Sequence, residues 1–413
     1  MTLHQKHNLR FLLISVATLL YFFANIQRSA VPGAVFDLLQ GDFLIDASKI
    51  TLLGAIFCYV YAFVQLIVGL MVDKIGGFRV VALGSIIFSI GALLFPLADN
   101  LALLYLSRAL VGFGGATFYL STIREVKKFA KDKNFSLAVS YILFVGYFGG
   151  VVANAPLVLG AHNFGWRATF YLIAFITIIL SLIYLVSLFI FKPIHIEKET
   201  KWSLAPFREV LLNKNNIHLY VFGATNYGLY YVLQSVIGKK FLEDFSGFEV
   251  STSALILSIM AIISAFAGTI SAFISKKIDN KRAIIFKTYA ILSVFSVTSV
   301  FLCLFFNFHT KLIALIFCIP SFIGSISPLL IANLHLINKY EVTATAVAMQ
   351  NFSFFMMVGV LGMASGMLMN VFAPVETQGT LIYPNQSYLL VFGLFFIISV
   401  IELIYAFKLK DEY

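Results

Sequence analysis

Long apolar runs with few or no charges recur along the whole chain of 413 residues. A helix needs about 20 predominantly apolar residues to cross the hydrocarbon core of a bilayer. Runs of about this length lie at residues 10–37, 47–72, 80–97, 101–123, 135–160, 167–191, 217–238, 250–275, 283–306, 312–337, 342–371 and 387–407. The sequence therefore predicts an all-α membrane protein with twelve transmembrane helices.

The composition excludes the other common classes of protein. Charged residues make up 12% of the chain, against about 25% in soluble globular proteins. Aromatic residues make up 16%, which is too many for a disordered chain. The three cysteines lie inside apolar runs, so we expect reduced core residues and neither a disulfide nor a metal set at Cys58, Cys303 and Cys318.

The distribution of Lys and Arg predicts the orientation. If the N-terminus is cytoplasmic, 22 of the 29 basic residues lie on the cytoplasmic face and five lie on the other face. This asymmetry follows the positive-inside rule and places both termini in the cytoplasm. It also accounts for most of the net charge of +10, so we expect no nucleic acid partner.

The first run bears on localisation. It is longer than the apolar region of a signal peptide and lacks a small-residue cleavage site, so we expect it to stay in the mature protein. We predict a multi-pass protein of a bacterial-type inner (plasma) membrane. It would work as a monomer in the lipid bilayer, with a small molecule as its substrate.

The longest polar interruption is residues 192–216, and it divides the predicted spans into six and six. We therefore expect an N-terminal six-helix bundle at 1–191, a cytoplasmic linker at 192–216 and a C-terminal six-helix bundle at 217–413. Two such halves suggest a duplicated transporter with its solute site between them. A duplicated channel would give the same pattern.

A motif after the second span carries a resemblance to a known family. The chain has Gly69-Leu-Met-Val-Asp73-Lys74-Ile-Gly76-Gly77-Phe-Arg79. This stretch resembles the signature G-x-x-x-D-[RK]-x-G-x-[RK]-[RK] that the major facilitator superfamily carries between its second and third spans. It departs from the signature in Gly77 and Phe78, where basic or polar residues are common.

The resemblance implies a conformational latch made by Gly69, Asp73, Lys74, Gly76 and Arg79. In the family this loop holds the cytoplasmic side in the outward-facing state. Physical chemistry suits these residue types: Gly69 allows close helix approach, Asp73 can meet the positive end of a neighbouring helix, and Gly76 permits a tight turn. We expect Glu125, at the inner end of the fourth span, to pair with Arg79 or neighbouring bases.

Three further stretches are similar to family patterns. They are Arg108-Ala-Leu-Val-Gly112-Phe-Gly114 on the fourth span, Gly165-Trp166-Arg167 at the start of the sixth, and Gly146 to Gly160 with Pro156 on the fifth. The fifth-span stretch departs from the antiporter pattern because Ala155 precedes the proline. The resemblance implies two pseudo-symmetric six-helix bundles that work by alternating access.

Arg28 is the most informative single residue. Tyr21, Asn25, Arg28 and Pro32 are spaced to share one helix face. An arginine at a helix centre in lipid costs about 2.5–3.5 kcal/mol on insertion scales, so we expect it to face a wet cavity or a partner. It could anchor a carboxylate or phosphate through its planar fork. Alternatively, it could reach the outer interface or bond to helix carbonyls.

Other polar residues inside spans are candidates for contact with the solute. Arg108 fits a helix-to-helix hydrogen bond equally well. Amides are costly to leave unpaired in lipid, whereas an aromatic stripe is more often packing than ligand. The remaining candidates are Gln27, Asn226, Tyr230, Gln234, Gln350 and Asn351.

Acidic residues are scarce in the predicted spans. Of the 19 Asp and Glu residues, only Glu402 sits plainly within one. Arg28 and Arg108 therefore leave the membrane interior net positive, which favours an anionic or zwitterionic solute over a cation. Nucleotide-binding and zinc-protease motifs and clustered Cys/His ligands were not found. We expect no enzyme, no catalytic residue, no cofactor and no metal.

The sequence therefore predicts a secondary active transporter of a small organic solute that works by rocker-switch alternating access. The solute's own gradient, exchange or a coupling proton could drive it. One alternative is an exporter of a larger amphipathic compound such as a drug or siderophore. Another is a membrane sensor with a transporter fold.

Overall fold

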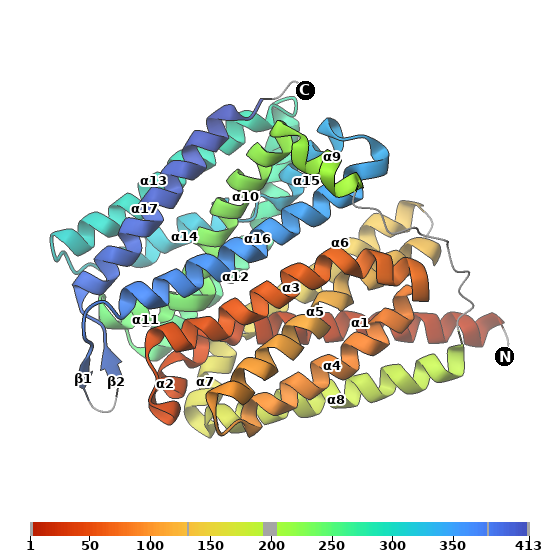
Figure 1. The fold of residues 1–413 in the computed structure, drawn as a ribbon, viewed down its shortest axis with the longest axis horizontal. Coiled ribbons are helices and arrows are strands. Elements are labelled where there is room, and N and C mark those ends of the chain that lie inside the picture. Colours follow the sequence, from red (N-terminus) through yellow and green to blue (C-terminus); the bar gives the residue numbers. More distant parts are fainter. Residues whose placement is uncertain (1–2, 130–131, 193–204, 378–379, 411–413) are drawn as a thin grey trace. The chain divides into compact units, whose positions relative to one another are not determined.

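The computed structural model describes residues 3–129, 132–192, 205–377 and 380–410, and long helices dominate it (Figure 1). The predicted linker 192–216 lies partly outside the described residues, and its part at Ala205–Leu212 is helical. The helices are α1 (Leu3–Ala30), α2 (Phe36–Phe43), α3 (Ala47–Ile75), α4 (Gly77–Leu97), α5 (Leu101–Phe129), α6 (Asp132–Val152), α7 (Ala155–Phe164), α8 (Trp166–Phe191), α9 (Ala205–Leu212), α10 (Lys214–Val232), α11 (Gly238–Asp244), α12 (Val250–Lys277), α13 (Arg282–Phe305), α14 (Ile313–Ile323), α15 (Ser327–Ile337), α16 (Tyr340–Met369) and α17 (Asn385–Lys408).

Ten helical segments in the described part of the chain are long and apolar enough to cross a membrane. An eleventh is a pair, Leu137–Val152 with Ala155–Phe164, which bends by 41°. Pro156 opens the second helix of this pair, and a proline interrupts helical hydrogen bonding. The predicted seventh span, 217–238, is not among these segments, because α10 is rich in Asn and Tyr and is therefore less apolar. The described helices are consistent with twelve spans.

The first span is shorter than its apolar run. The sequence predicts a helix to residue 37, but α1 ends at Ala30. Pro32 restricts the residue before it to an extended conformation, which favours a helix end there. A short 3₁₀ turn at Gly33–Val35 then leads into α2. Pro32 therefore does not extend the helical face of Tyr21, Asn25 and Arg28.

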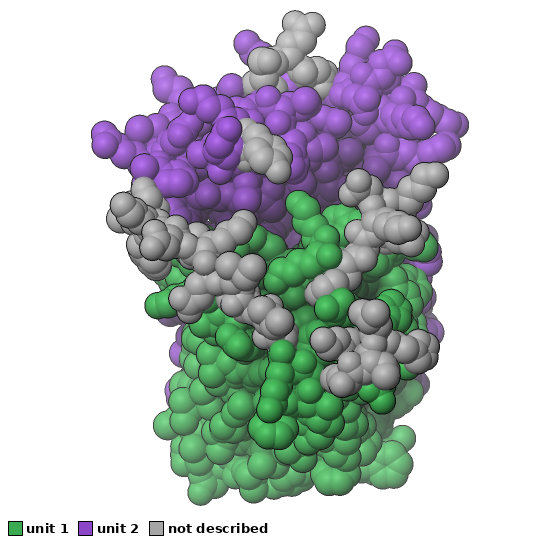
Figure 2. All heavy atoms as spheres, turned by 90° about the vertical axis from the view of Figure 1, so that its right-hand side faces the viewer, with its two compact units in different colours: residues 1–30, 56–202 green, residues 31–55, 203–413 purple. Residues whose placement is uncertain are grey.

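The chain divides into two compact units. Unit 1 consists of Met1–Ala30 and Ile56–Trp202, and unit 2 consists of Val31–Ala55 and Ser203–Tyr413 (Figure 2). Segment 31–55 thus groups with the C-terminal part of the chain. The boundary expected at the linker 192–216 stays a prediction.

Small residues bring the helices of unit 1 together. A Cβ atom added to Gly91 on α4 would lie 2.8 Å from the Cβ of Leu110 and the backbone nitrogen of Val111 on α5. A Cβ on Gly112 of α5 would lie 2.8 Å from the carbonyl oxygen of Phe57 on α3. Such contacts let helix backbones approach closely, which is how transmembrane helices commonly associate.

Unit 2 also contains a two-stranded ribbon that an all-α prediction does not include. Strands β1 (Val375–Thr377) and β2 (Thr380–Ile382) pair antiparallel, with Val375 opposite Ile382. The ribbon precedes Tyr383 and the start of α17 (Figure 1). The ribbon thereby positions Tyr383.

Candidate functional site

Arg28 lies in the last turn of α1 and is half-buried. Its guanidinium donates a hydrogen bond from Nη2 to the Oδ1 of Asn25 at 2.6 Å. The Nδ2 of Asn25 in turn donates to the carbonyl oxygen of Tyr21 at 2.8 Å. The face predicted from spacing is therefore present in the helix. The last turn also suits a cation because the helix dipole is negative there.

Tyrosines from several helices of unit 1 gather around Arg28. The positive charge of Arg28 acts on the hydroxyl groups of Tyr21, Tyr61 on α3 and Tyr147 on α6. The ring of Tyr21 also stacks on that of Tyr119 from α5, with centroids 5.3 Å apart. Of these four tyrosines, only Tyr21 belongs to a face that the sequence pattern predicts. The other three lie far apart in the chain, and no local pattern marks them.

Glycines on α6 explain how this cluster is assembled. A Cβ on Gly146 would collide with the ring of Tyr21, and a Cβ on Gly149 would lie 3.1 Å from the Cβ of Asn25. The glycine-rich stretch of the fifth predicted span therefore admits the polar face of α1. It holds Tyr21 and Asn25 in place within unit 1.

Arg108 on α5 is fully buried and has aromatic neighbours. Its guanidinium carbon lies 4.9 Å from the ring centroid of Phe57 and 6.0 Å from that of Phe95. Its Nη1 is 3.5 Å from the Oε1 of Gln27. The Nε2 of Gln27 has no hydrogen-bond partner among the described residues. Arg108 thus joins α1 to α5, as a helix-to-helix contact would, and leaves one amide donor of Gln27 unsatisfied.

Two glutamines of unit 2 also have buried amide atoms without hydrogen-bond partners in the described part of the chain. Both the Oε1 and the Nε2 of Gln350 on α16 are unsatisfied, and so is the Nε2 of Gln234. Gln234 lies in a π-helical turn, Leu233–Ile237, which continues α10. Such turns often mark functional positions. Asn351, next to Gln350, is half-buried.

Asn226 has a partner inside unit 2. Its Nδ2 donates to the Oε1 of Glu402 on α17 at 2.8 Å, and the hydroxyl of Ser293 on α13 donates to Oε2 at 2.8 Å. Glu402 is fully buried. Glu402, the acid that the sequence places within a span, therefore links α10, α13 and α17. Its hydrogen bond directs the side chain of Asn226 toward α17.

Tyr230 belongs to an aromatic group centred on its neighbour Tyr227. The ring of Tyr227 lies 5.6 Å from Tyr231, 5.0 Å from Phe354 and 6.2 Å from Phe355, measured between centroids. Its centroid is 6.3 Å from that of Tyr230. Aromatic pairs at these distances stabilise packing. The aromatic stripe on α10 thus packs against α16.

The latch residues of unit 1 form two pairs. The Nη1 of Arg124 lies 2.8 Å from the Oδ1 of Asp73. Glu125 accepts a hydrogen bond from the backbone N–H of Gly77 at 2.7 Å and pairs with Lys128 at 2.7 Å. Glu125 thus lies at the first residue of α4, while the expectation that Asp73 meets a helix start stays a prediction.

The glycines of this loop differ from what the signature suggests. A Cβ on Gly77 would lie 2.7 Å from Oε1 of Glu125 and from the carbonyl oxygen of Ser121, so only glycine fits here. Gly76 has a φ of 87°, which favours glycine as expected. Gly69, however, has no atom within 4 Å of an added Cβ among the described residues. The close helix approach expected at Gly69 stays a prediction.

Arg79 and Lys74 are exposed. Within the described residues, Arg79 forms no ion pair with Glu125, whose cationic partner is Lys128. Arg79 stands on the first turn of α4, whereas Lys128 lies one turn beyond Glu125 on the same helix. The neighbouring base is therefore the partner, and Arg79 is not.

The chain is similar in sequence to known transporters. The chain is 25% identical over 182 residues to the probable sulfoacetate transporter SauU of Cupriavidus necator, with 44% of this chain and 42% of that protein covered. It is 23% identical over 295 residues to the uncharacterized transporter YybO of Bacillus subtilis, with 65% and 66% covered. The chain thus spans about two fifths to two thirds of these relatives.

The fold resembles a solved transporter structure. A bacterial homologue of the human lysosomal transporter Spinster, crystallised in an inward-facing and unoccupied conformation, matches with a TM-score of 0.77. The match covers 98% of both chains at 17% identity, so it concerns the fold alone. The sequence pattern described as Major Facilitator Superfamily matches residues 17–363. This multi-pass, all-α membrane protein therefore belongs to the major facilitator superfamily, as its signature loop predicted.

Proposed function

We propose that the protein is a secondary active transporter of a small organic anion or zwitterion, working by rocker-switch alternating access across the inner membrane. The observation that carries the proposal is the cluster of Arg28, Asn25 and surrounding tyrosine hydroxyls in unit 1. A guanidinium recognises carboxylate, sulfonate and phosphate oxygens through paired N–H donors.

Unsatisfied amides support this solute class. In unit 1 the Nε2 atom of Gln27 is a buried donor without a partner among the described residues, and in unit 2, taken separately, so are those of Gln234 and Gln350. Buried polar atoms are nearly always hydrogen-bonded in folded proteins, so each exception calls for a reason. A solute rich in acceptor oxygens would satisfy such donors. SauU, one of the similar proteins, bears a name that specifies an organic anion.

The proposal is tested by a thermal-shift screen of the purified protein. The panel contains sulfoacetate, inorganic phosphate, a dicarboxylate and the lipophilic cation tetraphenylphosphonium. We expect at least one anion to raise the apparent Tm of the wild type, because a ligand that binds only the folded protein stabilises it. We expect no shift with Arg28→Ala. Stabilisation by the cation alone would contradict the proposal.

A second candidate is an exporter of a larger amphipathic compound. The aromatic group around Tyr227 favours it, because stacked rings offer contact area to an apolar ligand. Tyr227→Ala separates the two candidates. A small anion would keep its affinity in this variant, whereas an amphipathic compound would lose about fivefold, corresponding to the ~1 kcal/mol that an aromatic pair contributes.

The orientation is part of the proposal. Both termini lie in the cytoplasm in this account, since the basic residues concentrate on that side. Alkaline phosphatase fused after Lys408 should be inactive in bacterial cells, because the enzyme needs an oxidising compartment. An active fusion would show that the C-terminus lies outside the cytoplasm, opposite to the proposed orientation.

A further inference from the structure

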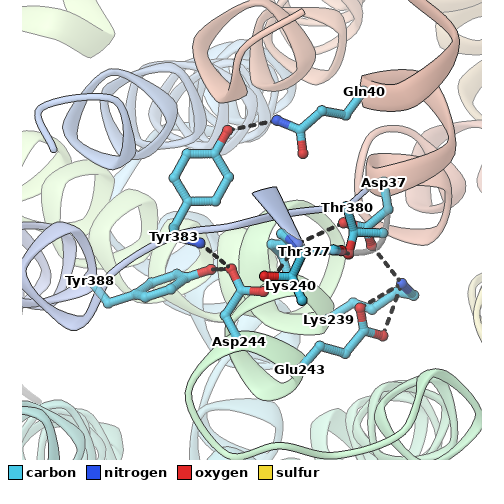
Figure 3. A network of polar contacts seen from close by, with 10 residues as sticks. All are labelled: Asp37, Gln40, Lys239, Lys240, Glu243, Asp244, Thr377, Thr380, Tyr383 and Tyr388. Atoms are coloured by element: carbon cyan, nitrogen blue, oxygen red, sulfur yellow. Dashed lines mark hydrogen bonds and ion pairs between the residues drawn. The ribbon is translucent and has the colours of Figure 1, made fainter. Parts of the chain in front are cut away.

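A network of buried charges ties segment 31–55 to the rest of unit 2 (Figure 3). Asp37 on α2 lies 3.2 Å from the Nζ of Lys239 and 2.8 Å from the Nζ of Lys240, both on α11. Lys239 also pairs with Glu243 at 2.9 Å, and Lys240 with Asp244 at 3.0 Å. We call these five residues the Asp37 network.

The network is buried and supported from a third element. The side chains of Lys239 and Lys240 are only 5% and 3% exposed, although the sequence suggests two ordinary loop lysines. Asp244 accepts hydrogen bonds from the backbone N–H of Tyr383 at 3.0 Å and from the hydroxyl of Tyr388 at 2.8 Å. Removing one member of such a buried set leaves an uncompensated charge, which is strongly unfavourable.

Asp37 is the anionic member that segment 31–55 contributes. Neighbouring contacts of the same segment are neutral: Gln40 donates to the hydroxyl of Tyr383 at 2.7 Å, and the backbone N–H of Ala47 donates to Asn370 at 3.2 Å. Because Asp37 reaches both lysines, its pairing decides how tightly this segment is held.

The network carries more carboxylates than ammonium groups. Asp37, Glu243 and Asp244 supply three negative charges against two positive charges from Lys239 and Lys240. Binding of one proton would make the Asp37 network electrically neutral. Two lysines contact Asp37, and Asp244 has one lysine and two hydrogen-bond donors. Glu243 pairs only with Lys239 in the described part of the chain, so its ionised form is the least stabilised.

Burial raises the pKa of two of the three carboxylates, Glu243 and Asp244, and at Asp244 the rise is opposed by Lys240 and by the hydrogen bonds from Tyr383 and Tyr388. Burial raises the pKa of Glu243 to about 7, against the opposing effect of Lys239. Asp37 is also desolvated, yet Lys239 and Lys240 hold its pKa below the ordinary value. Other titratable groups at this end are Tyr383, Tyr388, Asp46, which acts on Tyr383, and His309, which bonds to the carbonyl oxygen of Phe245 at 2.7 Å.

We propose that the Asp37 network is a proton-binding site that fastens segment 31–55 to the rest of unit 2, and that protonation of Glu243 tightens the fastening. Ionised Glu243 competes with Asp37 for Lys239 and repels it. Protonated Glu243 leaves Lys239 to Asp37. The inference rests on the alternating access proposed above, in which this end faces outside and must open. It does not depend on the solute.

The sign of the pH effect follows from linkage. Glu243 has a raised pKa when the network is intact and an ordinary one, about 4.3, when the segment separates and water enters. The fastened form therefore binds the proton more tightly and gains population as the pH falls through 7. Between pH 8 and pH 6 the ratio of fastened to separated molecules should rise about tenfold.

The experiment measures the distance between two spin labels by pulsed electron paramagnetic resonance in detergent. One label is placed at Gly41→Cys on α2 and the other at Lys311→Cys before α14, both exposed positions, with the three native cysteines replaced by serine. We expect the short-distance population of this reporter protein to grow about tenfold, relative to the long one, from pH 8 to pH 6.

Three variants of the reporter protein make the test specific. Glu243→Gln imitates the protonated acid, so it should keep the short distance at both pH values. Asp37→Asn removes the anchor and should favour the long distance at both. Glu249→Gln alters an exposed acid outside the network and should respond like the unaltered reporter. A full pH response in Glu243→Gln, or none in the unaltered reporter, would overturn the proposal. Loss of transport with an intact distance response would contradict only the proposed function.

Discussion

At the scale of the residue, Arg28 carries the functional argument. Its hydrogen bond to Asn25 fixes the guanidinium at the end of α1, beside tyrosines from other helices of unit 1. The fixed guanidinium is pre-organised, so less rotamer entropy is lost when it binds an anion. Arg108, by contrast, is enclosed by Phe57 and Phe95. This difference makes Arg28 the first residue to alter.

Arg28→Ala should abolish binding of the anion with expression unchanged. Losing a charged hydrogen-bonding partner costs about 2 kcal/mol or more, which is at least about 30-fold in affinity. Arg28→Lys should recover only part of it, since a point charge does not reproduce a bidentate fork. Isothermal titration with the anion found in the thermal-shift screen measures both.

Arg208→Ala is the control for this pair, because Arg208 is an exposed arginine on α9. It should bind like the wild type. Wild-type affinity in Arg28→Lys would mean that charge alone matters, and wild-type affinity in Arg28→Ala would remove Arg28 from the site.

At the scale of the element, the turn between α3 and α4 shows how the signature residues work. Gly76 takes a positive φ that ends α3, and α4 begins at once with Gly77. The carboxylate of Glu125 then caps the start of α4 by accepting the N–H of Gly77. A carboxylate is favourable at a helix N-terminus, where the dipole is positive.

Gly77→Ala should destabilise unit 1, because the added methyl group would collide with Glu125 and the backbone of Ser121. Overpacking of this kind costs about 1–3 kcal/mol, which lowers the apparent Tm by about 2–6 °C. Gly69→Ala is the matched control, since its methyl group meets open space. Thermal unfolding in detergent compares them, and equal Tm values would refute the packing argument.

Asp73→Asn should slow turnover more than it weakens solute binding. Its pair with Arg124 is partly exposed, and such pairs contribute up to about 1 kcal/mol, or about fivefold in a conformational equilibrium. Arg124→Gln should have the same effect, and the double variant should add little to either. Strictly additive effects on the transport rate would show that the two residues act separately.

The sequence predicted the elements and faces that depend on local patterns. Apolar run length predicted the spans, and helical spacing predicted that Asn25 and Arg28 share a face. Partners distant in the chain could not be predicted. In the sequence Lys239 and Lys240 look like ordinary loop residues. Their partner Asp37 lies about 200 positions earlier, so no local pattern reveals the pairing. The pairing of Asp73 with Arg124 likewise depends on how α3 packs on α5.

At the scale of the whole molecule, alternating access links these features. In this account a fastened segment 31–55 and a formed Asp73 loop stabilise different states of the transporter, and the solute shifts the balance by its differential affinity for them. A proton at the Asp37 network would add to that balance from outside. External acid would then change the rate of transport without being transported.

Transport should depend on the external pH through the Asp37 network. Between pH 8 and pH 6 outside, the step that requires segment 31–55 to separate should slow by up to about tenfold in the wild type. Glu243→Gln should be slow throughout and nearly independent of pH. Exchange rates in proteoliposomes at fixed internal pH measure this, and the same slowing between pH 8 and pH 6 in Glu243→Gln would assign the pH effect to another group.

Uptake into proteoliposomes tests whether Arg28 receives a small organic anion for transport. Radiolabelled sulfoacetate and the other anions of the thermal-shift panel are offered to vesicles containing the wild type or Arg28→Ala. We predict saturable uptake of at least one anion by the wild type and background uptake by the variant. Equal uptake by both proteins, or uptake of tetraphenylphosphonium with no anion carried, would contradict the account.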